Sequence, residues 1–399
     1  MISVEELDEK YIINTYGRQK ERNLFLVRGE GVYVWDEQGR RYLDFVGGLA
    51  VNLLGHCYPA VVDAVCKQVA ELSHVSNLYY TRPQAELARI LVENSAADQV
   101  FFANSGAEAN EAAFKLARKY HHPGRYKIIT AGKSFHGRTL ATVTATGQDK
   151  YQRGFAPLPE GFLYAQFNNL ASFEKLVDGE TAAIMIEPVQ GEGGVYVAEG
   201  DFIRGLRELC DRTGVLLIFD EVQCGMGRTG KLWAYEHWGV QPDIFTVAKG
   251  LGGGLPIGVM LARSEVAGAF APGDHASTFG GNPVVCRAAL AVLQTILEKP
   301  FLDEVAQRSA LFMNGLQRLA KSSAGEIKEI RGLGMMAALE LREPQAVRAQ
   351  RECQQKGLLV NAIGEHTLRF LPPLVSSEAE LEQALKILEA VLGGLEEGQ

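Results

Sequence analysis

The chain has 399 residues, of which 47% are hydrophobic and 22% charged, and its formal net charge is −8. This composition is ordinary for a globular protein of two or three domains, and the acidic balance without a basic run argues against a nucleic-acid-binding surface. The chain contains no apolar stretch of about 18 residues, so we expect no membrane-spanning helix. Residues 1–10 are acidic and polar, unlike a targeting peptide, and the six scattered cysteines form no Cys-x-x-Cys pair. We therefore expect a cytoplasmic protein with reduced thiols and neither a disulfide frame nor a zinc site.

In chain order, the first predicted element is a β-hairpin over residues 31–45, with its turn at residues 37–39. Short, almost wholly apolar runs follow, and helical patterns such as residues 109–120 separate them. The apolar runs predict strands that are buried on both faces, at residues 100–103, 127–130, 183–186, 215–219 and 244–248.

This alternation predicts an α/β fold, in which helices flank both faces of a mostly parallel sheet. The C-terminal part predicts a long helical stretch, strands at residues 335–341 and 368–371, and a closing amphipathic helix. We expect residues 56–290 to form the large domain. Residues 1–55 and 291–399 are expected to pack together as a smaller α+β domain.

Ligands of such sheets bind beyond the carboxyl ends of the strands. Lys249 stands at one such end, and glycines follow within residues 250–254. Burial disfavours an ammonium and makes the neutral amine more available, which suits Schiff-base chemistry with a carbonyl; the glycines let a flat ring approach closely. On this segment alone, an exposed lysine that opens a flexible loop is an equally good interpretation.

Two further strand ends carry polar or aromatic residues. Ser105 and Gly106 follow the first predicted strand and open a helix, where free N–H groups bind anions, although Ser105 also fits a simple N-cap. Phe135 and Arg138 follow the second strand, where they suit stacking on a planar ligand and pairing with a carboxylate. A structural phenylalanine and an exposed arginine are the simpler interpretation.

Three carboxylates follow the next two strands, namely Glu187, Glu192 and Asp220. Asp220 fits either a helix cap or a partner that keeps a ring nitrogen protonated. Residues 225–230 match G-x-G-x-x-G, but they do not join a strand directly to a helix. They are therefore a poor candidate for a dinucleotide site.

Five segments together resemble one family. They are Ser-Gly-Ala-Glu-Ala-Asn at residues 105–110, Phe-His-Gly-Arg-Thr at 135–139, Glu-Pro-Val-Gln-Gly-Glu at 187–192, Asp-Glu-Val-Gln at 220–223 and Ala-Lys-Gly-Leu-Gly-Gly-Gly at 248–254. In this order, and over almost the whole chain, they are similar to the class III aminotransferases. That family uses pyridoxal 5′-phosphate (PLP) on a fold-type I scaffold, so the resemblance implies this scaffold, this cofactor and a transaminase activity.

The resemblance also implies the contacts of the cofactor ring. Lys249 looks like the lysine that forms the Schiff base with PLP and, once freed, acts as the base for the 1,3-proton shift. Asp220 matches the aspartate on the pyridine nitrogen, which keeps the ring an electron sink. Gln223 matches the partner of the phenolic oxygen, and Phe135 matches the aromatic residue that stacks on the ring.

For the phosphate, the family pattern implies the helix start formed by Ser105, Gly106 and Ala107. Thr278, within residues 275–283, matches a threonine that reaches the phosphate of the neighbouring subunit. The resemblance therefore implies a homodimer with shared active sites.

The charged residues imply how two different substrates use one site. Arg138 looks like the arginine for the donor's carboxylate far from the reacting amine, and Arg369 like the arginine for the α-carboxylate of glutamate. Glu192 matches the glutamate that pairs with Arg369 while an ω-amino donor is bound. Release of Glu192 would free Arg369 for the second half-reaction with 2-oxoglutarate.

Within the family, the chain is most similar to members that act on N2-acetyl-L-ornithine, through residues 14–18, 77–80, 135–139 and 145–148. Leu49 stands where relatives acting on free ornithine carry a tyrosine, and an apolar residue suits an acylated α-nitrogen that needs no charged partner. The resemblance thus implies transfer of the δ-amino group of N2-acetyl-L-ornithine to 2-oxoglutarate in arginine biosynthesis. The alternative donors are N-succinyl-LL-diaminopimelate, ornithine and 4-aminobutyrate.

Overall fold

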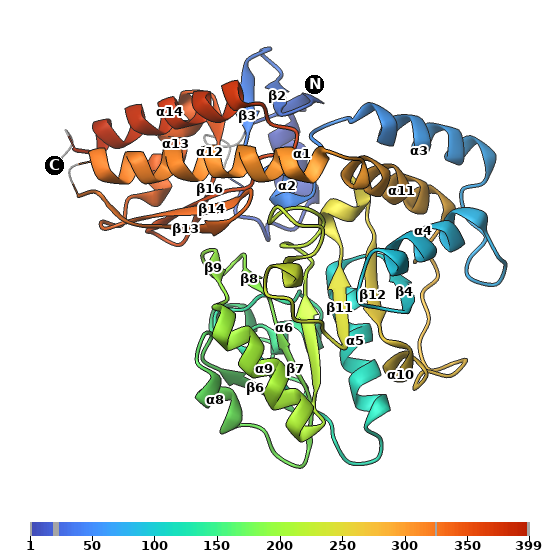
Figure 1. Ribbon diagram of the computed structural model, residues 1–399. Helices are drawn as coiled ribbons and strands as arrows, with labels where there is room; N and C mark the ends of the chain where they lie inside the picture. The colour runs from blue at the N-terminus through green and yellow to red at the C-terminus, as the bar shows by residue number, and fades with distance from the viewer. Residues whose placement is uncertain (1, 19–23, 324, 397–399) are drawn as a thin grey trace.

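The structure is a computed structural model that describes residues 2–18, 24–323 and 325–396. A wide sheet flanked by helices forms the lower part of Figure 1, and two smaller sheets with the C-terminal helices form the upper part. In the upper part, the blue N-terminal strands lie beside the orange and red C-terminal elements. The predicted α/β class is confirmed.

The central sheet has seven strands in the order β4-β12-β11-β10-β7-β5-β6. They are β4 (Gln99–Ala103), β5 (Lys127–Ala131), β6 (Phe162–Ala165), β7 (Thr181–Ile186), β10 (Leu216–Asp220), β11 (Ile244–Val247) and β12 (Gly258–Ala262). All five predicted strands are present, as β4, β5, β7, β10 and β11; the sequence patterns did not predict β6 and β12. Only β12 breaks the common strand direction, because it pairs antiparallel with both β4 and β11.

The sheet's three middle strands, β7, β10 and β11, are buried along their whole length. Helices cover both faces, so these strands have no polar face and their sequences show no alternation. The predicted helix over residues 109–120 is part of α5 (Gly106–Tyr120), which packs on β11 and β12. Its apolar residues at positions 109, 113 and 116 are fully buried, as their spacing predicted.

The other helices around this sheet are α3 (Pro59–Glu71), α4 (Arg82–Glu93), α6 (Leu140–Ala145), α7 (Asp149–Gln152), α8 (Leu170–Glu174), α9 (Gly200–Thr213), α10 (Ser264–Ala267) and α11 (Pro283–Leu297). Two 3₁₀ helices, η1 (Ala234–His237) and η2 (Lys249–Gly252), and a two-stranded ribbon, β8 (Val189–Gln190) with β9 (Tyr196–Val197), lie in the loops. The helices α3, α4 and α11 pack together.

The upper part contains two four-stranded sheets. The first has β1 (Leu26–Glu30), β2 (Tyr33–Asp36), β3 (Arg41–Asp44) and β15 (Leu358–Leu359); the second has β13 (Ile327–Leu333), β14 (Met336–Leu341), β17 (Thr367–Phe370) and β16 (Asn361–Ile363). Their helices are α12 (Phe301–Ser322), α13 (Ala346–Gln355) and α14 (Glu378–Glu396). The predicted hairpin is present as β2 and β3, and the two predicted C-terminal strands are β14 and β17.

The two ends of the chain meet where β3 pairs in parallel with β15, with Leu43 opposite Leu358. This pairing supports a smaller domain built from both flanks of the chain. The boundaries near residues 55 and 290 stay a proposal.

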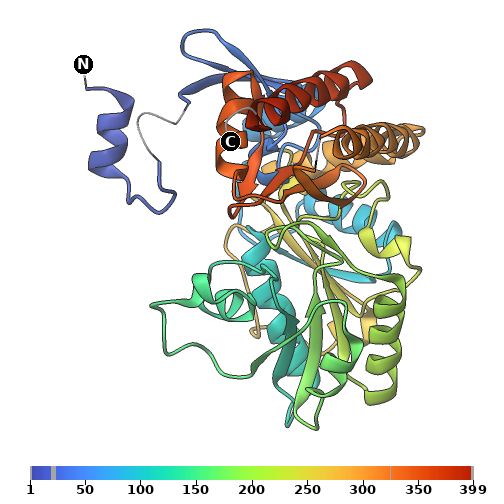
Figure 2. The same ribbon diagram turned by 90° about the vertical axis from the view of Figure 1, so that its left-hand side faces the viewer.

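The N-terminal helix α1 (Val4–Tyr11) stands apart from the body of the chain in Figure 2, and none of its residues is buried. Within the described part of the chain, no helix combines the length and the apolar character needed to cross a bilayer. All six cysteines are free.

Candidate active site

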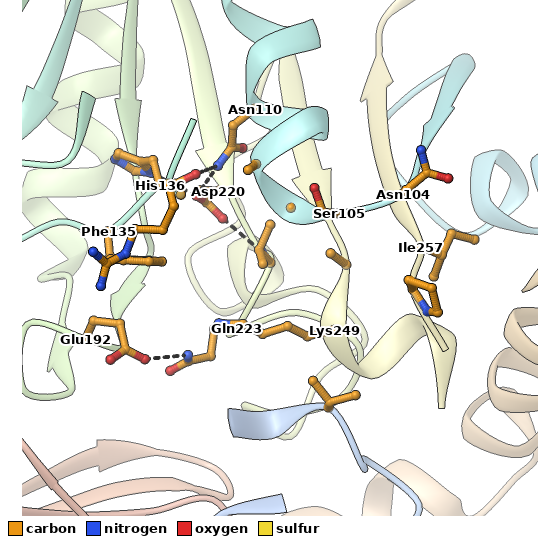
Figure 3. Close-up of a pocket in the computed structure, with 18 of the residues that line it drawn as sticks. Asn104, Ser105, Asn110, Phe135, His136, Glu192, Asp220, Gln223, Lys249 and Ile257 are labelled. Atoms are coloured by element: carbon orange, nitrogen blue, oxygen red, sulfur yellow. Dashed lines mark hydrogen bonds and ion pairs between the residues drawn. The ribbon is translucent and has the colours of Figure 1, made fainter. Parts of the chain in front are cut away.

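Residues that follow the strands of the central sheet surround a cavity of about 480 Å³. Figure 3 shows their side chains around a common space. The cavity includes all the cofactor-binding candidates of the sequence analysis except Thr278, together with Arg138 and Glu192. A cavity therefore lies at the carboxyl edge of the sheet, where the strand pattern predicted a ligand site.

Asp220, the last residue of β10, is held by three hydrogen-bond donors. Its Oδ2 accepts from Asn110 Nδ2 and His136 Nδ1, each at 2.8 Å, and its Oδ1 accepts from the Val222 N–H at 3.0 Å. His136 Nε2 has no partner among the described residues, which assigns the ring's proton to Nδ1, facing the carboxylate. Asn110 is fixed in turn, because its Oδ1 accepts from the Thr246 hydroxyl at 2.7 Å. The network fixes the direction in which the carboxylate faces the cavity.

Lys249 follows β11 and begins η2, half-buried in the cavity wall. Its φ of +43° lies in the left-handed region, which is strained for a residue with a side chain and occurs preferentially at functional sites. Burial lowers the pKa of its ammonium below the ordinary value, although Glu192 and Asp220 act in the opposite direction. The lowered pKa makes the neutral amine more available as a nucleophile.

The first turn of α5 lies at the edge of the cavity, and its free N–H groups are of the kind that bind anions. Ser105 is the N-cap, and its Oγ accepts from the Glu108 N–H at 3.2 Å. The N–H groups of Gly106 and Ala107 are not used inside the helix and carry the positive end of its dipole. A Cβ on Gly106 would lie 2.7 Å from the Val222 side chain, so only glycine lets the helix start approach this loop. Ser105 therefore both caps the helix and lines the cavity.

Phe135 and Arg138 form the wall beyond β5. The Phe135 N–H donates to Glu187 Oε2 at 2.8 Å, and the ring meets Tyr151 edge-on, with the centroids 5.5 Å apart. The exposed Arg138 guanidinium lies over the Tyr151 ring at 4.1 Å and pairs with no carboxylate in the described residues. It is thus available to an anionic ligand. Burial raises the pKa of the Glu187 carboxyl, against the opposing effect of His136.

Arg369 enters from β17 of the smaller domain, with its side chain fully buried. Its Nη1 donates to Glu192 Oε1 at 2.6 Å and to Gln223 Oε1 at 3.3 Å. Its Nη2 donates to Asn361 Oδ1 at 2.6 Å. Burial alone would raise the pKa of Glu192, but Arg369 and Lys249 outweigh it and lower that pKa. The structure thus brings together the pair that the sequence analysis expected.

Glu192 belongs to the segment between β8 and β9, which packs closely on Gln223. A Cβ on Gly191 would lie 1.9 Å from Gln223 Oε1, so any side chain at position 191 would displace the Gln223 amide. Gln223 Nε2 also donates to Glu192 Oε1 at 3.3 Å, as Figure 3 shows. One amide therefore contacts both members of the ion pair.

Two predicted residues lie at the margin. Thr278 is exposed and does not line the cavity of its own chain. Leu49 is 44% exposed and belongs to α2 (Gly47–Ala50), whose φ angles are all positive and which precedes the cavity residue Val51. The turn at α2 is left-handed, which is costly at Leu49 because it has a side chain.

The segment at residues 225–230 folds as turns and leads to no α-helix, which agrees with the judgement that it is not a dinucleotide fingerprint. Arg228 within it is buried, and its Nη1 donates to the carbonyls of Met335 and Pro372. Its role is to join this loop to the smaller domain. The neighbouring Glu221 accepts N–H donors from Ala234 and Tyr235 at 2.7 and 2.8 Å, and burial raises its pKa to about 8.

Sequence reasoning missed three residues of the site: Asn110, His136 and Asn361. Asn110 could have been found, because an amide on the apolar face of α5 must have a buried partner. His136 stands inside a recognised segment, but nothing local links it to Asp220, 84 positions away. Asn361 gives no local signal, because its place opposite Arg369 depends on the register of β16 and β17.

Comparisons with known proteins identify the family of the chain. Residues 15–392 match the family model described as aminotransferase class-III. The curated acetylornithine aminotransferase of Caldanaerobacter subterraneus subsp. tengcongensis is 51% identical, over 96% of this chain and 98% of its own length. That of Methanocaldococcus jannaschii is 48% identical over 97% of both chains.

Solved structures give the same result. An ornithine aminotransferase from Toxoplasma gondii, with partial occupancy of PLP at its active site, has a TM-score of 0.94 and 31% identity, covering 100% of this chain and 96% of that one. An acetylornithine aminotransferase from Elizabethkingia anophelis has a TM-score of 0.86 and 33% identity, over 98% of both chains. Because the family model covers residues 15–392 and the Caldanaerobacter subterraneus relative is 51% identical over 96% of the chain, the chain belongs to the class III aminotransferases.

Proposed function

We propose that this chain uses PLP to transfer the δ-amino group of N2-acetyl-L-ornithine to 2-oxoglutarate, giving N-acetyl-L-glutamate 5-semialdehyde and glutamate, a step of arginine biosynthesis. The observation that carries the proposal is the Glu192–Arg369 pair in the same site as Lys249 and Asp220. The curated relatives support this choice of donor.

The cavity fits the cofactor, because a fixed carboxylate, an anion-binding helix start and a lysine with a lowered pKa surround one space. When bound, PLP supplies an electron sink for the bond that breaks at the amine-bearing carbon. Asp220 would bind the ring nitrogen, and Phe135 and Gln223 would contact the ring face and the phenolic oxygen. Ser105, Gly106 and Ala107 would bind the phosphate.

Lys249 would hold the cofactor covalently through Nζ and, once released, carry a proton away from the substrate carbon. An amine that is half-buried in the cavity wall suits both tasks, because desolvation lowers its pKa toward the working pH. This role for Lys249 is part of the proposal.

The substrates would be distinguished by charge. Arg138, whose guanidinium has no carboxylate partner within the described chain, would bind the distal carboxylate of the donor. While that donor reacts, Glu192 would neutralise Arg369. When 2-oxoglutarate enters, its α-carboxylate would replace Glu192 on Arg369.

We also propose a cytoplasmic homodimer with shared active sites. Thr278 is exposed outside the cavity of its own chain, which suits a contact with the phosphate bound by the partner subunit. Tyr79 and Tyr80, exposed to 69% and 104%, and Phe279, exposed to 59%, offer apolar surface for such an interface.

The first experiment is the absorption spectrum of the purified protein, recorded before and after adding N2-acetyl-L-ornithine without a keto acid. We expect a yellow protein whose band is lost to the pyridoxamine form. A yellow protein that ignores this donor would redirect the proposal to ornithine, N-succinyl-LL-diaminopimelate or 4-aminobutyrate. A protein that stays colourless after PLP is added would contradict the cofactor.

Relative kcat/KM across those donors then decides specificity, because specificity is a difference in transition-state binding. A preference for free ornithine over its acetylated form would overturn the proposed donor.

A further inference from the structure

Asn361 occupies a second acceptor position on the Arg369 guanidinium. The two residues face each other across the antiparallel pair of β16 and β17. Asn361 Oδ1 accepts from Nη2 at 2.6 Å, as short as the contact between Nη1 and Glu192 Oε1. Arg369 is therefore held by one carboxylate and one neutral amide at the same short distance, in addition to the longer contact of Nη1 with Gln223 Oε1 at 3.3 Å.

The two partners differ in how they are attached to the fold. Glu192 lies in the segment between the two-residue strands β8 and β9, and its side chain is 22% exposed. Asn361 lies on the three-residue edge strand β16, which pairs with β17 and places Asn361 in register with Arg369 itself. Loop segments open at low free-energy cost, whereas paired strands do not. Glu192 is thus the partner able to leave, and Asn361 is the partner that stays.

The charge of the residue at position 361 determines the net charge that an incoming substrate carboxylate encounters at Arg369. A fixed carboxylate at position 361 would neutralise Arg369 in both half-reactions, whereas an amide orients the guanidinium and leaves its charge intact. Arg369 Nε also has no partner in the described chain, so the guanidinium keeps donor capacity for a ligand.

We propose that Asn361 is a specificity-determining residue for the keto-acid substrate. Its neutral acceptor holds Arg369 in place throughout the cycle, so that an α-carboxylate meets a full positive charge once Glu192 has moved away. This inference rests on the proposed function, because it takes the acceptor to be a 2-oxo acid.

The test is Asn361→Asp, which keeps the size and the acceptor oxygen and adds only a charge. In the holoenzyme, the donor half-reaction with N2-acetyl-L-ornithine and the acceptor half-reaction with 2-oxoglutarate are followed separately by absorbance. We expect KM for 2-oxoglutarate to rise about tenfold or more, because an added unit charge within hydrogen-bonding distance competes directly with the substrate. The donor half-reaction should keep its rate.

Asn361→Ser serves as the uncharged control, and it should raise KM for 2-oxoglutarate less than the aspartate does. Calorimetric binding of glutarate, a non-reacting dicarboxylate, gives a readout without turnover and should weaken in parallel with KM. The thermal midpoint of each variant shows whether it folds; if the aspartate variant does not fold, glutarate binding to the serine variant decides. If the serine variant bound glutarate as tightly as the unaltered protein but had lost turnover, the proposal would be contradicted.

Two other results would overturn it: equal losses in both half-reactions of Asn361→Asp, or no change in either. If the unaltered protein reacts with 2-oxoglutarate but not with N2-acetyl-L-ornithine, the proposed donor is wrong. The effect of Asn361→Asp on the 2-oxoglutarate half-reaction then still decides the inference about Asn361.

Discussion

Glu192→Gln tests directly whether Glu192 neutralises Arg369 in the donor half-reaction and releases it in the 2-oxoglutarate half-reaction. The Arg369 side chain is fully buried and the two charges meet at 2.6 Å. Hydrogen bonds to charged groups contribute about 1.5–3 kcal/mol, and a contact in which both partners are charged belongs at the upper end of that range. Glutamine keeps an acceptor oxygen and leaves Arg369 as the one charged partner, so the contact should fall toward the lower end and weaken by about 1–1.5 kcal/mol. Since 1.4 kcal/mol corresponds to a factor of ten in an equilibrium constant, a substrate carboxylate should displace residue 192 from Arg369 about tenfold more readily.

The two half-reactions should therefore move in opposite directions. KM for 2-oxoglutarate should fall by up to about tenfold, because its carboxylate no longer competes with a charged neighbour. The donor half-reaction with N2-acetyl-L-ornithine should slow, because an uncompensated guanidinium then faces an uncharged part of the substrate. Stopped-flow absorbance measures each half-reaction alone.

Glu199→Gln is the matched control, because Glu199 is exposed, follows the β8–β9 ribbon at its far end and makes no side-chain cap to α9. It removes the same charge and should leave both half-reactions unchanged. If Glu192→Gln moved both half-reactions in the same direction, the alternation of Arg369 between Glu192 and substrate would be refuted.

Three further changes test other parts of the site. Lys249→Ala should abolish turnover and leave PLP bound without a covalent link, which absorbance and dialysis measure; normal turnover would refute the role of Lys249. Leu49→Tyr should raise the kcat/KM ratio of free ornithine to N2-acetyl-L-ornithine, because it adds a polar partner at the same left-handed backbone position; an unchanged ratio would remove Leu49 from the specificity argument. The pKa of Glu221 is raised to about 8, so its contribution to stability is complete below its ordinary pKa and is lost as pH rises through about 8. Glu221→Gln should therefore lower the urea midpoint of unfolding at acidic pH. It should also reduce the loss of that midpoint as the pH rises toward 8. If the midpoint fell with pH as steeply as in the unaltered protein, a group other than Glu221 would cause the loss.

The sequence predicted the carboxyl edge of the sheet well, for a physical reason. Strands that are buried on both faces are short apolar runs, and the polar residue after each run is necessarily at the sheet's edge. Asp220 and Lys249 were found in this way: Asp220 is the last residue of β10, and Lys249 lies two residues after the end of β11. The sequence could not show that β12 runs antiparallel to its neighbours, because strand direction has no signature in an apolar run.

What the sequence could not supply is the contacts between distant segments. The Asp220–His136 hydrogen bond and the Arg369–Asn361 contact depend on sheet order and strand register, which no local pattern encodes. The left-handed turn at α2 was also missed, because its two glycines predict a flexible loop as readily as this conformation. Family resemblance supplied Arg369 and Glu192, and neither would have been paired from spacing alone.

The pairing of β3 with β15 has a consequence for how the chain is made. Leu43 and Phe45 donate their N–H groups to the carbonyls of Gly357 and Leu359, which leave the ribosome more than three hundred residues later. Until then β3 has β2 as its one sheet partner, and its other edge offers open hydrogen-bonding groups to any strand nearby. The large sheet can form in the meantime, since its last strand ends at Ala262. During synthesis the N-terminal hairpin therefore keeps an unpaired edge until β15 (Leu358–Leu359), near the end of the chain, pairs with it.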